Sequence, residues 1–249
     1  MSENLIPEEP YRTIARNLQR LEARISAACA RVGRNRSEVT LVAVSKTRSI
    51  AEIRAAYACG LRHFGENLVE EAETKIPELR RALADDPAVW HLIGHVQSRK
   101  ARRAAELADL IHSVDSVRLA TRLDRFAEEL SRRLPILVQI NVSGEATKYG
   151  WAAWDAETSE ASLREIESLA KLEHLEVRGL MTMAPLVDDA ELVRPVFRAL
   201  RELRDLYRQR LDFSAWRDLS MGMTNDFEVA IEEGATLVRI GRALFDPNT

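Results

Sequence analysis

Cysteine is nearly absent from this sequence of 249 residues, which has only Cys29 and Cys59 and no CxxC pair. A disulfide framework or a cysteine-based metal site is therefore not expected, and both thiols should be reduced. Long apolar runs are absent as well, since none approaches the ~20 residues of a membrane-spanning helix. The N-terminus, MSENLIPEEP, has neither the basic nor the apolar region of a secretory signal. These absences predict a cytoplasmic protein without a membrane segment.

Neither sign of charge predominates, because the formal net charge is −3 and the pI is about 6.0. This balance gives no general attraction to nucleic acid or to an anionic membrane. Lysine is scarce: five of the 36 basic residues are lysines, namely Lys46, Lys75, Lys100, Lys148 and Lys171. A lysine at the end of an apolar stretch therefore stands out, and Lys46 has that position.

Short, β-rich apolar runs alternate with helical stretches along most of the chain. Before them, residues 11–32 carry apolar side chains at helical spacing, and this helix is expected to end near Gly33. The candidate strands are Leu41–Ser45, His63–Asn67, Trp90–Gly94, Leu110–Asp115, Pro135–Val142, Val177–Met183, Asp218–Gly222 and Leu237–Gly241. Eight strands that alternate with helices predict a parallel sheet, and their number favours a closed (β/α)8 barrel of the TIM type. A doubly wound open sheet is the alternative.

No linker rich in proline, glycine or serine divides the chain. We therefore expect one domain over residues 1–249, in which residues 1–35 form a helical extension packed outside the barrel. The segment Gly144–Asp155, GEATKYGWAAWD, is expected to be the most flexible loop.

The predicted strands end in polar, glycine-rich residues, although their bodies are apolar. In a barrel these ends meet at one mouth, where active sites lie. Lys46 directly follows the first strand, LVAVS, so partial desolvation there would free its amine as a nucleophile toward carbonyl groups. The alternative is a lysine whose apolar stem is buried and whose charged head is solvated.

Two loops near the end of the chain resemble a phosphate cradle. SMGMTND and RIGRA follow the seventh and eighth strands, a pair that often binds phosphate in barrels. Gly222 would let backbone N–H groups approach an anion, and Gly241 and Arg242 lie in the second loop. Asn225 and Glu228 have the spacing of a capping box at the start of the helix FEVAIEEGA. The alternative is that both glycines only turn the chain.

The segment HLIGH, from His91 to His95, imitates the spacing of a zinc motif but lacks its glutamate. It is predicted as a strand, in which four residues span roughly 13 Å, too far for one metal ion. We therefore expect no metal site. His91 should pack within or near the barrel, and His95 should lie at its mouth.

The resemblance to a known family rests on the order and spacing of motifs that run from the first strand to the last. They are LVAVSKT, HFGENLVEEA, WHLIGHVQSRK, IHSVD, QINVSGEATKYGW, RGLMTM, LSMGMTNDFEVAI and VRIGRALF. The chain resembles the pyridoxal phosphate homeostasis proteins, which are single-domain relatives of the alanine racemase N-terminal barrel. The resemblance implies pyridoxal 5′-phosphate (PLP) as the cofactor, held as a Schiff base on Lys46.

The same resemblance implies the other cofactor-binding residues. Those around the phosphate would be Ser220, Gly222, Met223, Thr224, Gly241 and Arg242. Arg239 would meet the pyridine nitrogen, and Asn67 and His91 would lie in strand ends that face the ring. Because an arginine stays charged, it cannot protonate that nitrogen, and the ring remains a poor electron sink.

Two positions depart from the family pattern. Arg99 stands in HVQSRK where the family usually has asparagine, and Asp246 stands in RALFDP where a glycine usually follows the phenylalanine. The first puts the contacts near the third strand in doubt. The second lies beyond the phosphate loop and should matter less.

Three functions are compatible with these residues and this resemblance. The favoured one is a PLP-binding protein of intracellular vitamin B6 homeostasis, with no catalytic residues and with apo PLP-dependent enzymes as candidate recipients. The alternatives are a PLP-dependent racemase or decarboxylase, and a cofactor-free aldolase that uses Lys46. The resembled racemases take a second base, a tyrosine, from a further C-terminal domain, and here only Tyr149 lies in a mouth loop. Without that domain and its dimer contacts, a monomer is expected.

Overall fold

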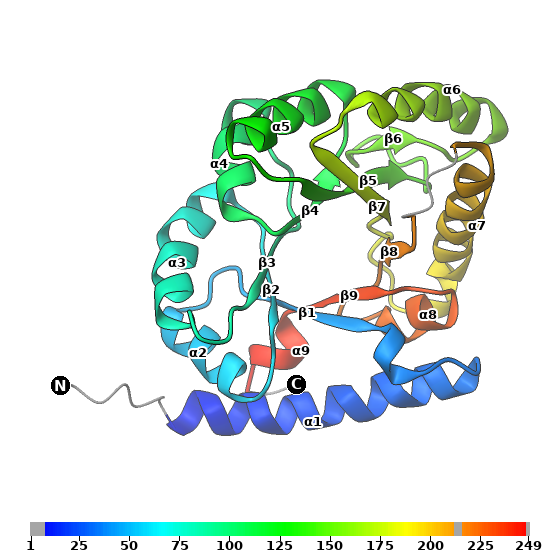
Figure 1. Cartoon of the computed structure of the whole chain (residues 1–249). Helices are drawn as coiled ribbons and strands as arrows, with labels where there is room; N and C mark the ends of the chain where they lie inside the picture. Colours follow the sequence, from blue (N-terminus) through cyan, green and yellow to red (C-terminus); the bar gives the residue numbers. More distant parts are fainter. Residues whose placement is uncertain (1–7, 212–215, 248–249) are drawn as a thin grey trace.

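A closed ring of parallel strands forms the centre of the molecule (Figure 1). The computed structural model describes residues 8–211 and 216–247. Its strands are β1 (Thr40–Val44), β2 (His63–Glu66), β3 (Val89–Leu92), β4 (Leu110–Val114), β5 (Leu134–Asn141), β6 (Trp151–Ala152), β7 (Leu175–Met181), β8 (Asp218–Ser220) and β9 (Leu237–Ile240). They pair in the order β4-β3-β2-β1-β9-β8-β7-β5, and β4 also pairs with β5. That last pairing closes the ring, so the barrel prediction is confirmed and the open-sheet alternative is wrong.

Helices surround this ring on the outside. They are α1 (Glu8–Arg31), α2 (Ile50–Ala58), α3 (Val69–Ala82), α4 (Ala101–Leu107), α5 (Val117–Glu129), α6 (Ala156–Glu167), α7 (Arg194–Leu211), α8 (Phe227–Glu232) and α9 (Arg242–Phe245). Short 3-10 turns are η1 (Arg36–Glu38), η2 (Ser98–Lys100), η3 (Ser168–Lys171) and η4 (Ala190–Val193). No helix in the described part of the chain is long and apolar enough to cross a membrane.

Each predicted strand overlaps one strand of the ring, but the predicted flexible loop is partly ordered. Within Gly144–Asp155, the two residues of β6 pair with the end of β5, where Ile140 is opposite Trp151. Gly150, just before β6, has a φ of +115°, and a Cβ there would lie 2.7 Å from the Gln139 carbonyl oxygen. Only a glycine therefore allows the loop to return this close to β5.

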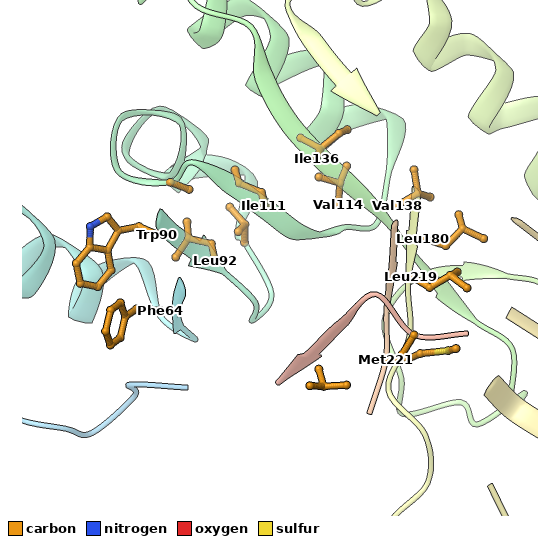
Figure 2. Close-up of a cluster of buried hydrophobic side chains, with 14 of the residues drawn as sticks. Phe64, Trp90, Leu92, Ile111, Val114, Ile136, Val138, Leu180, Leu219 and Met221 are labelled. Atoms are coloured by element: carbon orange, nitrogen blue, oxygen red, sulfur yellow. The ribbon is translucent and has the colours of Figure 1, made fainter. Parts of the chain in front are cut away.

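The core has two layers because strand side chains alternate between the inside and the outside of the ring. The outer layer lies between strands and helices, and Figure 2 shows part of it, with Phe64, Trp90 and Leu92 on neighbouring strands. The inner layer is small, and its apolar members are Val42, Leu110, Leu137, Met181 and Leu237. The remaining space inside the ring contains polar side chains, which are described below.

Helix α1 packs on the outside of the barrel against α2, α8 and α9. Its buried face includes Ile14, Leu21 and Ile25, as its helical spacing predicts. Asn17 on this face donates hydrogen bonds to the carbonyl oxygens of Leu244, at 3.1 Å, and of Asp246, at 2.8 Å. The N-terminal helix therefore anchors the turn that follows β9.

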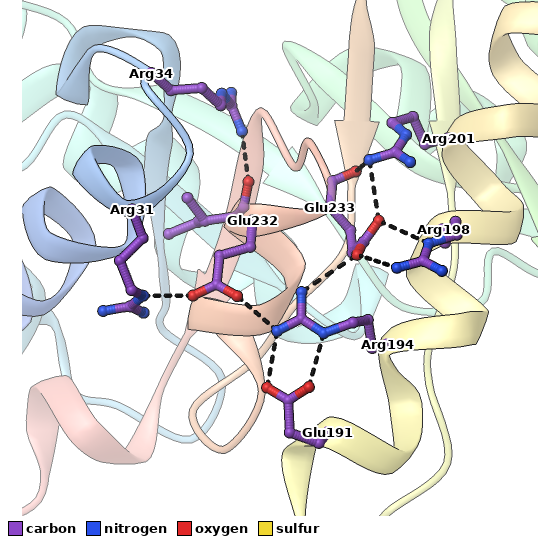
Figure 3. Close-up of polar contacts among 9 residues, drawn as sticks. Arg31, Arg34, Glu191, Arg194, Arg198, Arg201, Glu232 and Glu233 are labelled. Carbon is purple, nitrogen blue, oxygen red and sulfur yellow. Dashed lines mark hydrogen bonds and ion pairs between the residues drawn. The ribbon is translucent and has the colours of Figure 1, made fainter.

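An ion-pair cluster joins α1, α7 and α8 (Figure 3). Arg194 of α7 contacts Glu232 at 2.6 Å and Glu233 at 3.2 Å. The Glu233 carboxylate is buried and also meets Arg198 and Arg201, while Arg31 of α1 meets Glu232 at 2.6 Å. Burial raises the pKa of Glu233, but the hydrogen bonds from these arginines outweigh it and lower the pKa below its ordinary value.

Candidate functional site

A cavity of about 430 Å³ opens where the strands end. Of the residues expected at the site, those that line it are Lys46, Asn67, Met223, Thr224, Arg239, Gly241 and Arg242. They come from the ends of β1, β2 and β9 and from the loop after β8. The structure therefore brings seven residues that are far apart in the sequence to one face of the barrel, the face expected for chemistry in this fold.

Lys46 follows β1 in a turn whose backbone is held on both sides. The carbonyl oxygen of Ser45 accepts a hydrogen bond from Lys75 Nζ at 2.8 Å, and the Thr47 amide donates to the Glu71 carboxylate. Thr47 has a φ of +62°, which is uncommon for a residue with a Cβ. Lys46 itself is exposed, so the partial desolvation expected from its neighbours is not found.

A buried polar cluster lies directly behind Lys46. Glu66, with no exposed surface, accepts hydrogen bonds from Ser45 Oγ at 2.7 Å and from Lys75 Nζ at 3.2 Å. Burial raises the pKa of Glu66, against the hydrogen bond from Ser45 and the charge of Lys75. Sequence reasoning missed this cluster, although Glu71 and Lys75 have the i,i+4 spacing of a helical ion pair.

The loop after β8 is shaped by Gly222, which is buried and does not line the cavity. Its φ is +91°, and a Cβ there would lie 2.6 Å from Ala230 Cβ and 3.0 Å from Phe227 Cα. The residue thus lets the loop pack on α8 and directs Met223 and Thr224 toward the cavity. The predicted capping box is wrong: Asp226 is the N-cap residue of α8, without a side-chain cap, and Glu228 instead pairs with Arg24.

Arg239 is the buried cation of the site. Its Nη1 donates to Ser220 Oγ at 2.6 Å and its Nη2 to the Thr182 carbonyl oxygen at 3.0 Å. Burial lowers the pKa of Arg239 to about 10, and the charge of Asp226 opposes this shift. The guanidinium therefore remains charged at neutral pH.

Ser220 and His91 are placed elsewhere than at the cavity wall. Ser220 lies beneath Arg239 and has no exposed surface. His91 is buried inside the ring, where its Nε2 is 3.0 Å from His63 Nδ1 and its Nδ1 is 2.8 Å from His112 Nε2. This agrees with the expectation that His91 packs within the barrel and not with the expectation that it faces the ring of a cofactor.

The ends of β2 and β3 approach closely at Asn67, which lines the cavity. A Cβ on Gly94 would lie 2.3 Å from the Asn67 carbonyl oxygen, so no other residue fits there without a shift of the backbone. His95 follows at the mouth, as expected, and its Nδ1 is 2.9 Å from Asp115 Oδ2. Among the described residues, no group of three or more His, Cys, Asp or Glu side chains is arranged to hold a metal ion.

An open, partly apolar rim surrounds the cavity. The His95 ring stacks on the Tyr149 ring, with centroids 4.2 Å apart and an interplanar angle of 16°. Tyr149 is 55% exposed, and Leu186, which also lines the cavity, is 84% exposed. Sequence reasoning identified Tyr149 as a mouth residue but did not predict its stacking partner.

The two departures from the family pattern lie outside the cavity lining. Arg99 is exposed, and its Nε donates to Gln97 Oε1 at 3.0 Å. The Asp246 carboxylate pairs with Arg48, and its carbonyl oxygen accepts the hydrogen bond from Asn17. Both residues therefore act in local structure and not at the cavity wall.

Comparison with known proteins identifies the family. Residues 16–248 match the model for the alanine racemase N-terminal domain. The pyridoxal phosphate homeostasis protein of Pseudomonas aeruginosa is 43% identical over 234 residues, which cover 94% of this chain and 95% of that protein. The chain belongs to the pyridoxal phosphate homeostasis protein family. A family member from Escherichia coli K12 is 41% identical over 237 residues, with 93% and 95% coverage.

Solved structures support both the family and the fold. PipY of Synechococcus elongatus, solved with PLP bound, aligns with a TM-score of 0.78 at 39% identity and covers 93% of this chain and 99% of its own. A protein of unknown function from Bifidobacterium adolescentis aligns with a TM-score of 0.89 at 35% identity, with 98% and 99% coverage. Alanine racemase from Corynebacterium glutamicum shares the fold alone, with a TM-score of 0.68 at 17% identity, over 94% of this chain and 61% of its own.

Proposed function

We propose that this protein binds PLP as a Schiff base on Lys46 and acts in intracellular PLP homeostasis without turning over a substrate. The observation that carries the proposal is the convergence of the Lys46 amine, the Arg239 guanidinium and the two glycine-containing loops on one cavity. The relative PipY, whose structure contains PLP, supports the choice of cofactor.

The chemistry of the lining residues fits PLP, which supplies an aldehyde, a phosphate and a pyridine ring. Lys46 offers a primary amine that can bond to the aldehyde carbon. The phosphate would lie against Met223, Thr224, Gly241 and Arg242, with Arg242 as the countercharge. The short helix α9 starts after Gly241, so Gly241 and Arg242 enter the cavity side by side at the end of β9.

Arg239 would face the pyridine nitrogen in this arrangement. Arg239 donates two hydrogen bonds to Ser220 and Thr182, and a guanidinium has donors but no acceptor. It therefore cannot give the ring nitrogen a full proton, and it leaves the ring a weak sink for electrons. This supports cofactor holding over carbanion chemistry.

The open rim supports exchange of the cofactor. Lys46 is exposed, and Tyr149 and Leu186 at the mouth are exposed, so an amine from outside would have access to a cofactor held at Lys46. We propose that this open mouth serves delivery of the cofactor to apo PLP-dependent enzymes, whose active-site lysines would take the place of Lys46 while the Lys46 amine is regenerated. We also propose that the protein is a monomer of one domain and works in the cytoplasm.

A racemase or decarboxylase remains the second candidate because of one observation. His95, hydrogen-bonded to Asp115, lies at the cavity and is a titratable group that can accept a proton. A two-base reaction needs a further base on the opposite face, and Tyr149, the tyrosine that lines this cavity, is stacked on His95 itself. The structure therefore favours exchange at one face at most.

The test of the proposed function is the visible absorption spectrum of the purified protein before and after borohydride reduction, followed by peptide mapping. Reduction should abolish the visible absorption of the bound cofactor and leave the pyridoxyl group on Lys46 as a secondary amine. Lys46→Ala should bind no PLP covalently, whereas Lys171→Ala, at an exposed lysine far along the chain, should behave as wild type. A pyridoxyl group found mainly on Lys75, Lys100, Lys148 or Lys171 contradicts the site.

A further inference from the structure

A ladder of hydrogen-bonded polar side chains crosses the inside of the barrel. It consists of His63 (β2), His91 (β3), His112 (β4), Ser220 (β8) and Arg239 (β9), and we call it the polar ladder. His112 Nδ1 is 2.8 Å from Ser220 Oγ, which accepts from Arg239 at 2.6 Å. The three imidazoles then follow one another at 2.8 Å and 3.0 Å. The interior of a TIM-type barrel is usually filled by branched apolar side chains, so a continuous row of hydrogen-bonded polar side chains there is unusual.

The ladder begins at the candidate cofactor cavity and ends at the opposite mouth of the barrel. Arg239 lines the cavity at the strand ends. His63 lines a second cavity of about 420 Å³, bordered by first residues of strands such as Leu110 and Asp218. His91, which is 2% exposed, also borders this second cavity, whereas His112, between the two cavities, has no exposed surface.

We infer that the polar ladder has one direction of donation, and that His112, acting through Ser220, is a positioning residue that holds the Arg239 guanidinium toward the cofactor cavity. The second half of this inference rests on the proposed function, because it assigns Arg239 to the cofactor. The first half concerns the chain alone and is tested without PLP.

The direction follows from the chemistry of arginine. Because a guanidinium has donors only, Ser220 Oγ must accept from Arg239, and its single hydroxyl hydrogen is free for His112 Nδ1. A neutral imidazole with an accepting Nδ1 carries its hydrogen on Nε2, so His112 donates to His91 Nδ1. By the same reasoning His91 Nε2 donates to His63 Nδ1.

Burial keeps these imidazoles neutral. Desolvation is the largest cause that lowers the pKa of His91 to about 3, and it also lowers the pKa of His112 well below its ordinary value. Desolvation lowers the pKa of His63 in the same sense. A neutral ladder with its accepting nitrogens turned toward Arg239 places the negative ends of three ring dipoles on the side of the buried cation.

The opposite direction is less favourable. It would require His112 Nδ1 to donate to Ser220 Oγ, which already accepts from Arg239. The serine hydroxyl hydrogen would then have no acceptor among its contacts within the described residues, and a buried donor without an acceptor is costly. The two directions predict different tautomers and can be distinguished by experiment.

The first experiment is long-range ¹H–¹⁵N correlation of the histidine rings in protein without PLP at neutral pH. His91 and His112 should show the Nε2–H tautomer, and Ser220→Ala should change the signals of His112 and leave those of His174, which lies outside the ladder, unchanged. A population of Nδ1–H tautomer at His91 or His112 in the wild type overturns the direction.

The second experiment measures the absorption spectrum and the affinity of added PLP in His112 variants. His112→Leu should shift the absorption maximum of bound PLP and weaken binding only modestly, by roughly threefold, since a hydrogen bond in a chain to a charged group is lost. His112→Gln, whose amide can both accept and donate, should restore most of both. His174→Leu is the matched control and should leave both unchanged.

The outcomes separate this inference from the proposed function. If folded His112→Leu binds PLP with the wild-type spectrum and affinity, His112 does not position Arg239 and the inference is overturned. If the wild type binds no PLP at all, the proposed function fails, while the tautomers still decide the direction of the ladder. If His112→Leu does not fold, the rescue by His112→Gln and the tautomers of the wild type decide the inference.

Discussion

The Lys75 ammonium nitrogen lies 2.8 Å from the carbonyl oxygen of Ser45, the residue directly before Lys46. The same ammonium contacts the buried Glu66 at 3.2 Å and also pairs with Glu71, which accepts from the Thr47 amide. One buried lysine thus fixes the backbone that presents another, exposed lysine to the cavity.

Replacing Lys75 by methionine should therefore destabilise the protein and loosen the Lys46 turn. We expect the free energy of unfolding to fall by about 3 kcal/mol at neutral pH, because a buried carboxylate is left without its partner. Burial already raises the pKa of Glu66, so its protonation favours the folded variant, and the loss should shrink as the pH falls toward 5 and grow toward 8. Urea unfolding at several pH values measures this, with Lys171→Met as the exposed control. An equal loss at every pH contradicts the role given to Glu66.

The Gly222 conformation gives a prediction with a matched control. Gly222→Ala combines a φ of +91° with a clash at Ala230 Cβ, 2.6 Å away. Gly60 has a similar φ of +98°, and a Cβ there would meet nothing within 4 Å. Gly60→Ala should cost about 1 kcal/mol from the backbone alone, and Gly222→Ala should cost about 1–3 kcal/mol more and also weaken PLP binding. Thermal unfolding and PLP titration of both variants measure the difference, and equal effects would show that the close packing on α8 is unimportant.

The Glu233 carboxylate should stabilise the fold in a pH-dependent way. Because the arginine hydrogen bonds hold its pKa below the unfolded value of about 4.3, its contribution is present above that pH and is lost as the pH falls through the folded pKa. Glu233→Gln should lower the free energy of unfolding by about 2 kcal/mol at pH 7. The difference from wild type should disappear in acid. Denaturant unfolding between pH 3 and pH 7 measures it, with Glu160→Gln, at an exposed pair with Arg210, as a control that changes little.

Arg239 should set the electronic state of the bound cofactor more than its affinity, because the phosphate carries the larger charge. Arg239→Glu should shift the absorption spectrum of PLP-loaded protein and change how it varies with pH, since a carboxyl group can share a proton with the ring nitrogen. Arg217→Glu, at an exposed arginine by the opposite mouth, should leave the spectrum unchanged. A wild-type spectrum in a folded, PLP-loaded Arg239→Glu variant counts against the contact with the ring.

Amino-acid turnover should stay below the usual enzymatic range of about 1–10³ s⁻¹. In the proposed arrangement Arg239 leaves the ring a weak electron sink, and Tyr149, the tyrosine among the described residues that line the cavity, is stacked on His95. Chiral chromatography of L- and D-amino acids incubated with the protein measures the rate, with Lys46→Ala to remove contaminant activity. Lys46-dependent racemisation or decarboxylation within that range would replace the homeostasis proposal with the enzyme alternative.

The strands and the strand-end site were predictable from the sequence, because both depend on local pattern. Apolar runs followed by polar ends place Lys46 and Arg242 at one mouth once the strands are known to be parallel. The polar ladder was not predictable, since it depends on which interior positions of β2, β3, β4 and β8 lie at the same level. That register is a non-local property of the ring, and a register shift between β4 and β5 adds to it.

Two features could not be predicted from the sequence, for related reasons. They are the two-residue strand β6 and the contacts by which Lys75 holds the backbone next to Lys46. β6 is too short for a periodic pattern, and Gly150 looks like a loop residue until its approach to Gln139 is seen. The sequence spacing of Lys75 and Glu71 is typical of an ion pair on an exposed helix surface. Lys75 is nevertheless buried, because it also contacts Glu66 of the preceding strand. The prediction of a capping box at Asn225 was wrong because the neighbouring Asp226 carboxylate accepts a hydrogen bond from the Met223 amide at 2.6 Å.

The pairing of β1 with β9 has a consequence for the order of events during synthesis. Lys46 is made early, directly after β1, whereas Arg239, Gly241 and Arg242 are made about 190 residues later, as β9 and the turn beyond it emerge. Until β9 inserts between β1 and β8, the nascent chain has the Lys46 amine but neither the buried cation nor the turn proposed to hold the phosphate. A growing chain should therefore be unable to capture the cofactor tightly, and loading becomes a property of the finished ring.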